Sequence, residues 1–131
     1  MRSPALVLIR LGPAIIFIIH GYLKLFGGLH DQTVALFLTV NLPNPELTAW
    51  FIGALELVGG VALLVGIFVR PLALLLAVEM AIAIYKVRLP QGFVGAWEFE
   101  FTLLLLLIGL AATDGRVGGV HNDHVVHTPK N

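Results

Sequence analysis

The chain has 131 residues, of which 58% are hydrophobic and only 12% charged; its formal net charge is zero and its mean hydropathy is +0.94. A soluble domain usually contains about 25% charged residues, so the composition predicts a single-domain membrane protein. The balanced charge, without a basic stripe, argues against a nucleic-acid partner, and the lack of cysteine excludes disulfides, thiol catalysis and any Cys-ligated cofactor.

Four apolar segments are predicted to span the membrane, because a spanning helix needs about 20 mostly apolar residues. In chain order they cover residues 4–26, 47–69, 71–87 and 96–113. Arg70-Pro71 predicts a very short turn, which makes the second and third helices antiparallel neighbours. The predicted fold is therefore an all-α membrane protein, a bundle of four transmembrane helices.

The first connection, residues 27–46, contains the apolar run 34–38, which is too short to span. We expect it to form a short interfacial or re-entrant segment. With both termini in the cytoplasm, that side holds five Lys and Arg residues and the opposite side holds three. This bias predicts an N-in, C-in orientation, with residues 1–113 as the transmembrane domain and 114–131 as a polar, flexible cytoplasmic tail.

Ionisable side chains inside a bilayer are costly, so each is a candidate for function or for a structural ion pair. Helix rise places Glu56 and Glu79 near the middle of their predicted helices. The outer part of the helices holds the others, so the polar residues collect on one side of the midplane; these are His20, Lys24, Lys86, Glu98 and Glu100. His20 and Lys24 share one helical face. Glu98 and Glu100 cannot both face the bundle centre, so we predict that Glu98 points inward and Glu100 towards the interface. Arg10 lies in the inner half and can snorkel to the surface.

Two interpretations of this polar set remain open. In the first it is a functional site, with candidate catalytic residues Glu56, Lys24, His20 and Glu98 and candidate ligand-binding residues Tyr22, Glu79, Lys86 and Arg10. In the second it is a network of buried ion pairs that fixes helix register, such as Lys24 with Glu56 or Glu98. The glycines near Glu56 are interpreted as a close-packing surface for a neighbouring helix.

Three histidines near the C-terminus, His121, His124 and His127, are spaced by three residues. They form a weak candidate site for a transition metal, since imidazole nitrogens are common metal ligands. No residue can be named that would hydrogen-bond to these histidines and hold their rings in a fixed orientation, so we predict no metal site.

Three motifs resemble the DoxX family. Residues 8–12 (LIRLG) and 20–27 (HGYLKLFG) are similar to its first-helix pattern. Residues 56–66 (ELVGGVALLVG), followed by Arg70, are similar to its second-helix pattern, and Ala-Trp-Glu at 96–98 fits the start of its last helix. The likeness extends from about Arg10 to Thr113, and the order and spacing of the motifs are fairly specific.

The resemblance implies a four-helix, multi-pass protein of a bacterial or archaeal plasma (inner) membrane. The family includes a subunit of thiosulfate:quinone oxidoreductase, and other members are similar to membrane partners of redox or detoxifying enzymes. The Arg, His, Lys and two Glu residues of the family correspond to Arg10, His20, Lys24, Glu56 and Glu98. The chain departs from the pattern at residues 112–116, which replace a Gly-Pro-Gly and Ser-Leu-Asp ending, and at Glu100, where an apolar residue or Pro is common.

We therefore expect a quinone-linked or redox-associated membrane subunit with a polar site in its outer half. The chain offers no redox group of its own beyond Tyr and Trp, so it would depend on a quinone and on a soluble or membrane redox enzyme. Two alternatives remain open: a non-enzymatic membrane scaffold or assembly partner, and a small-solute or proton conduit. The conduit would have to be a homo-oligomer, because four helices are few for a transporter.

Overall fold

The computed structural model describes residues 4–113, and all regular structure in this part of the chain is helical. The α-helices are α1 (Pro4–Leu25), α2 (His30–Thr39), α3 (Pro45–Val65), α4 (Val69–Ala83) and α5 (Glu98–Ala112). Between α4 and α5 the chain forms a π-helical turn η1 (Ile84–Arg88), a 3-10 turn η2 (Leu89–Gln91) and a kinked segment η3 (Phe93–Trp97), in which Val94 and Gly95 have non-helical backbone angles. The all-α prediction is confirmed.

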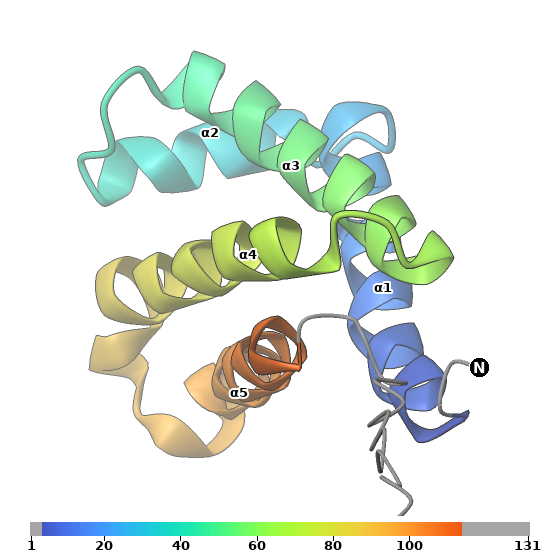
Figure 1. Ribbon diagram of the computed structural model, residues 1–131. Coiled ribbons are helices and arrows are strands. Elements are labelled where there is room, and N and C mark those ends of the chain that lie inside the picture. Colours follow the sequence, from blue (N-terminus) through green and yellow to red (C-terminus); the bar gives the residue numbers. More distant parts are fainter. Residues whose placement is uncertain (1–3, 114–131) are drawn as a thin grey trace, which may run out of the picture.

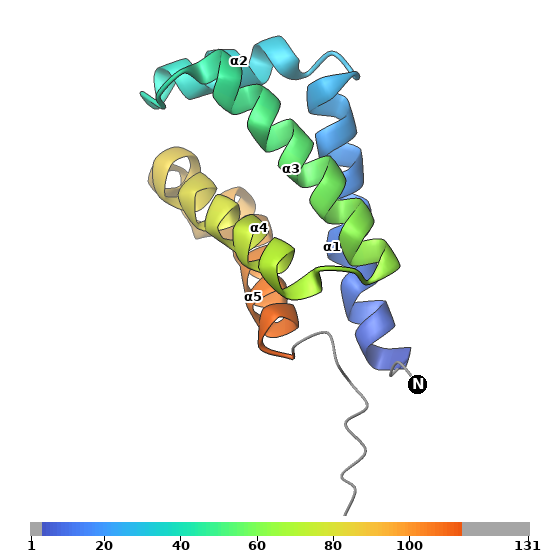
Figure 2. The same cartoon turned by 45° about the horizontal axis from the view of Figure 1, so that its top comes forward.

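The long helices form two pairs, α1 with α3 and α4 with α5 (Figure 1). The pairs come together near the turn between α3 and α4 and diverge towards the other end (Figure 2). Helix α2, which occupies the predicted short segment of the first connection, lies across the diverging end and contacts both α1 and α3. The molecule therefore has a closed end and an open end.

Glycines allow α1 and α3 to pack at backbone distance. A Cβ atom on Gly60 would lie 2.9 Å from the carbonyl oxygen of Ala14, and one on Gly21 would lie 2.7 Å from the carbonyl oxygen of Gly53. On another face of α3, Gly59 packs against the side chain of α4 residue Leu76. The interpretation of these glycines as a close-packing surface is confirmed, since small residues let membrane helices approach closely.

The turn between α3 and α4 differs from the predicted Arg70-Pro71 turn. Helix α3 ends where Gly66 takes a φ of +86°, and α4 begins directly after Phe68, which has a φ of +46°. Two residues with left-handed backbone angles thus reverse the chain within three positions. Gly66 adopts this conformation at no steric cost, because it has no Cβ atom. Pro71 lies instead in the first turn of α4, where its missing N–H breaks no intrahelical hydrogen bond.

By length and composition, three stretches of the described chain could cross a membrane: α1, α3 and Phe93–Ala112, which joins the kinked segment η3 to α5. Helix α4, the third predicted span, has 15 residues and is shorter than the usual span of about 20. The fourth crossing and the N-in, C-in orientation stay predictions. The predicted tail, residues 114–131 with its three histidines, lies outside the described residues.

Candidate functional site

A cavity of about 320 Å³ lies between the two helix pairs at the open end. Its walls combine apolar side chains from every α-helix, including Phe17, Phe37, Ile52 and Leu103, with a set of polar ones. The polar lining residues are His20, Lys24, Thr33, Thr48, Glu56, Glu79, Lys86, Arg88 and Glu100. The structure thus gathers in one place most of the ionisable residues that the sequence puts in the outer half.

The centre of the cluster is an ion pair between α1 and α3. Nζ of Lys24 donates a hydrogen bond of 2.7 Å to Oε1 of Glu56, and the two side chains are 19% and 3% exposed. Gly53 lies one helical turn before Glu56, and a Cβ atom there would come within 3.3 Å of the Lys24 Cβ. The missing side chain of Gly53 therefore lets α1 come close enough for the lysine to reach the glutamate.

Glu79 of α4 is the third member of the cluster. Its side chain is buried and interacts with both Glu56 and Lys24. In the described part of the chain, Oε2 of Glu56 and Oε2 of Glu79 are both buried without a hydrogen-bond partner. Two carboxyl groups therefore share a single ammonium group. A buried acceptor without a partner costs about 1–3 kcal/mol, so this arrangement favours uptake of a proton, a water molecule or a ligand that donates hydrogen bonds.

A second ion pair lines the cavity on the side of α4 and α5. Nε of Arg88, in the π-helical turn η1, donates to Oε1 of Glu100 at 3.1 Å, and the arginine also donates to the side chain of Gln91 at 3.3 Å. The Glu100 side chain is 12% exposed. Such π-helical turns are frequent at functional sites because they redirect the side chains that follow them.

The prediction that Glu98 points inward and Glu100 towards the interface is wrong. Glu98 is exposed, and its Oε1 accepts a hydrogen bond of 3.0 Å from the backbone N–H of Gly95, whereas Glu100 lines the cavity. The physical reason is the start of α5. Glu98 is the first residue of that helix and caps the turn before it, where Gly95 has a φ of +77°, so the register places Glu100 on the inner face.

The remaining candidates divide into two groups. His20 and Lys86 line the cavity although both are exposed. Tyr22 is 54% exposed and does not line the cavity, and its ring centroid lies 5.7 Å from that of Phe26. Arg10 is only 6% exposed, so it does not snorkel as predicted, and it lies outside the cavity. Of these four candidates, His20 and Lys86 therefore line the cavity, and Tyr22 and Arg10 do not.

Sequence reasoning did not single out Thr33, Thr48, Arg88 or Glu100 as wall residues. The 12 residues that separate Arg88 from Glu100 include two short irregular segments, η2 and η3, and no simple periodicity links residues across such a connection. The threonines lie near helix beginnings, where hydroxyl groups commonly serve the backbone, so their position on the cavity wall has no signature in the sequence.

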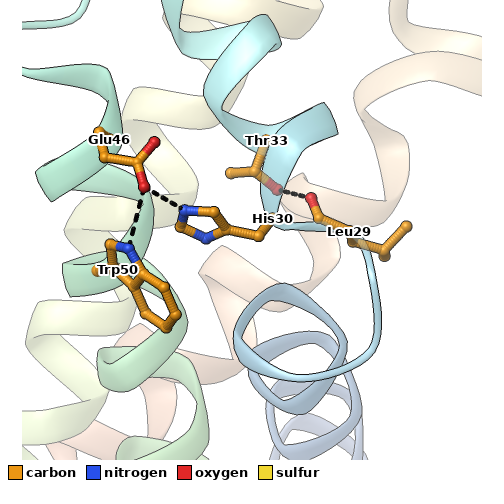
Figure 3. A network of polar contacts seen from close by, with 5 residues as sticks. All are labelled: Leu29, His30, Thr33, Glu46 and Trp50. Carbon is orange, nitrogen blue, oxygen red and sulfur yellow. Dashed lines mark hydrogen bonds and ion pairs between the residues drawn. The ribbon is translucent and has the colours of Figure 1, made fainter.

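A polar clamp holds α2 against the start of α3 (Figure 3). Oε1 of Glu46 lies 2.9 Å from Nε2 of His30 and accepts a hydrogen bond of 3.2 Å from Nε1 of Trp50. The imidazole and indole rings lie with their centroids 4.3 Å apart. The hydroxyl of Thr33 donates to the carbonyl of Leu29 in the first turn of α2. Because α2 forms part of the cavity wall, the clamp joins that wall to α3.

Among residues 4–113, no group of three or more His, Asp or Glu side chains is arranged to hold a metal ion. The polar side chains that line the cavity supply carboxyl, ammonium, guanidinium, imidazole and hydroxyl groups. These groups can exchange protons and orient a polar ligand in apolar surroundings.

Comparison with known proteins assigns the fold to a family. The DoxX family model matches residues 5–89, which is more than half of the chain and includes every cavity residue from α1 to η1. The chain belongs to the DoxX family. No solved structure matches this DoxX chain.

Two relatives of this DoxX chain are named proteins. It is 38% identical over 110 residues to "Putative oxidoreductase CatD" of Bacillus subtilis (strain 168), covering 84% of this chain and 79% of that protein. It is 37% identical over 74 residues to "Inner membrane protein YphA" of Escherichia coli (strain K12), covering 56% of this chain and 51% of that protein. With several candidate spans, the chain is a multi-pass DoxX protein of the inner membrane.

Proposed function

We propose that this DoxX protein is a quinone-linked membrane subunit of an oxidoreductase and that the quinone binds in the cavity at the open end. The observation that carries the proposal is the Lys24–Glu56 pair with Glu79 beside it, buried in apolar surroundings and facing a cavity. The name of the Bacillus subtilis relative supports redox chemistry for the family.

The cavity fits the size and chemistry of such a ligand. Its volume of about 320 Å³ lies at the lower end of the usual range for small-molecule sites, roughly 300–1,000 Å³. That space suits one ring, with a lipid-soluble tail leaving between the diverging helices. A quinone bound there takes up two electrons and two protons, and the electrons come from a soluble or membrane redox enzyme.

The residues of this chain then have distinct roles. Lys24 lies where it can donate a hydrogen bond to a ligand oxygen while it neutralises Glu56. Glu56 and Glu79 form a buried carboxyl pair that can hold and release a proton. His20, at the exposed side of the cavity, can exchange that proton with the surroundings.

We also infer that α4 together with η1 makes the fourth membrane crossing. Cavity residues come from the first half of α3, such as Thr48, and from the first turns of α5, such as Phe99 and Glu100. The two helices thus begin at the same end of the bundle, so the segment between them must return the chain across its whole depth. Together with the cytoplasmic bias of Lys and Arg, this inference supports a cavity in the outer half of the membrane.

The test is to purify the protein gently from native membranes and to identify every lipid-soluble molecule that accompanies it by mass spectrometry. Wild type is compared with Lys24→Met and Glu56→Gln, and Glu98→Gln serves as a control outside the cavity. We expect a quinone with wild type and with the control, and its loss from both cavity variants.

Wild-type protein without such a molecule, together with cavity variants that only unfold at lower temperature, would contradict the proposal. That result would make the polar cluster a structural ion-pair network and would favour a scaffold.

A further inference from the structure

Arg10 is a buried cation outside the cavity. The residue is only 6% exposed, and its Nε atom is buried without a hydrogen-bond partner. None of the ion pairs within residues 4–113 includes Arg10. An arginine stays protonated in proteins, and a buried charge without a counter-charge is costly, so this guanidinium needs an anionic partner.

The packing of α1 directs Arg10 into the bundle. Arg10 precedes Ala14 by four positions and Phe17 by seven, so the three residues share one helical face, and all three are buried. Ala14 and Phe17 belong to the apolar core that α1 shares with α3, α4 and α5. Arg10 therefore lies against neighbouring helices, at the closed end, and not on the surface that faces lipid tails.

The described part of the closed end has no acidic side chain. The acidic residues within residues 4–113 belong to the cavity, to α2 or to the beginnings of α3 and α5; they are Asp31, Glu46, Glu56, Glu79, Glu98 and Glu100. Arg10 precedes Lys24, the partner of Glu56, by 14 positions, which is about 21 Å of helix. Arg70, exposed in the first turn of α4, adds a second positive group at this end.

We propose that Arg10 binds the phosphate group of an anionic lipid headgroup at the closed end of the bundle. A guanidinium group presents its N–H bonds in a planar fork that matches two phosphate oxygens. Basic pockets between membrane helices on the cytoplasmic side bind such headgroups, and the predicted N-in orientation places the closed end on that side. The remaining exposure of Arg10 lets a phosphate oxygen reach it from the surface.

This lipid site goes beyond the proposed function and does not depend on it, because Arg10 is not part of the cavity. A lipid that binds only the folded protein stabilises it by mass action. Without the lipid, Arg10 is an unpaired buried charge, so a neutral side chain of similar length should be tolerated at least as well. The protein should thus depend on anionic lipid for stability, and Arg10 should be the reason.

The experiment adds dioleoylphosphatidylglycerol or dioleoylphosphatidylcholine to the purified full-length protein in detergent and measures binding by native mass spectrometry. Both lipids carry a phosphate, but only the first has a net negative charge. We expect the dissociation constant of the anionic lipid to be lower by roughly tenfold or more. Equal affinities for the two lipids would overturn the inference.

A matched pair of variants separates a specific site from general attraction. Arg10→Met should weaken binding of dioleoylphosphatidylglycerol by about tenfold or more. Arg70→Gln removes one positive charge from the same end, but from an exposed position that solvent ions screen, so it should weaken binding by only about threefold or less. Equal losses in the two variants would overturn the inference.

Thermal unfolding in the same detergent gives a second readout. Dioleoylphosphatidylglycerol should raise the unfolding temperature of wild type and leave that of Arg10→Met unchanged, and without lipid the variant should unfold no earlier than wild type. Should Arg10→Met fail to fold, Arg10→Lys takes its place, because it keeps the charge but loses the planar fork and should bind the anionic lipid more weakly than wild type.

The chain itself is the other source of anionic oxygens, since Asp114 and Asp123 lie outside the described residues. The double variant Asp114→Asn/Asp123→Asn should keep the wild-type preference for dioleoylphosphatidylglycerol. A lower unfolding temperature of both this variant and Arg10→Met, with no response of wild type to the anionic lipid, would assign the partner of Arg10 to the chain and overturn the inference.

Discussion

The closed and open ends of the bundle are built from opposite kinds of residue on the same helices. At the closed end, small and aliphatic side chains such as Ala14, Leu63, Ala73, Leu76 and Leu107 are buried against each other. At the open end, the same helices carry the carboxyl and amino groups of the cavity. Tight packing at one end can therefore hold costly polar groups in place at the other.

The largest expected effect comes from breaking the ion pair of the open end. Removing Lys24 by Lys24→Met leaves Glu56 as a buried charge and should destabilise the protein by about 3–5 kcal/mol. The double variant Lys24→Met/Glu56→Leu, which removes both charges, should recover most of that loss. Thermal unfolding in detergent measures both, and equal instability of single and double variants would show that the two side chains are not coupled.

The second effect comes from the packing of the closed half. Gly60→Ala inserts a methyl group 2.9 Å from the carbonyl oxygen of Ala14 and should cost about 1–3 kcal/mol. The matched control is Gly12→Ala on α1, where no atom lies within 4 Å of the added carbon and stability should be unchanged or slightly higher. If both variants unfold at the wild-type temperature, α1 and α3 do not approach as closely as described.

A smaller and local effect is expected at the clamp of α2. His30→Ala removes the contacts to Glu46 and Trp50 while leaving the long helices intact. Amide hydrogens of α2 should then exchange roughly tenfold faster, with those of α3 unaffected, as measured by hydrogen–deuterium exchange and mass spectrometry. Faster exchange throughout α3 as well would mean that the clamp supports the whole bundle and not only the wall of the cavity.

The smallest effect is expected at Glu98, which the sequence makes a prime candidate. Glu98→Gln preserves the hydrogen bond from Gly95 and should change stability by less than about 0.5 kcal/mol. Glu100→Gln, two residues further, should cost more because Glu100 is largely buried against Arg88. If Glu98→Gln lost more stability than Glu100→Gln, the inward-facing glutamate would be Glu98 and not Glu100.

Much of the helical framework and of the polar cluster is predictable from the sequence. Long apolar runs identify α1, α3 and α5, and simple helix rise places Glu56 and Glu79 near the middle of their helices and Lys24 on the outer side of the midplane. Both inferences need only lengths and spacing. They do not depend on the details of the connections.

The remaining features depend on irregular backbone that periodicity does not describe. The left-handed conformations of Gly66 and Phe68 move the turn before Arg70, and the turn at Gly95 rotates Glu100 inward in place of Glu98. Arg10 is buried by packing between helices, which no property of its own segment reveals. Such details follow from tertiary contacts and not from local propensity.

The most direct test of the cavity as a quinone site is photo-crosslinking in native membranes with a quinone that carries an azide group on its ring, followed by peptide mass spectrometry. We expect labelled peptides from the open end, above all those that contain residues 16–24 and 79–88, and suppression of the label by excess hydroquinone. Label confined to peptides of the closed end, or label that excess hydroquinone does not suppress, would contradict it.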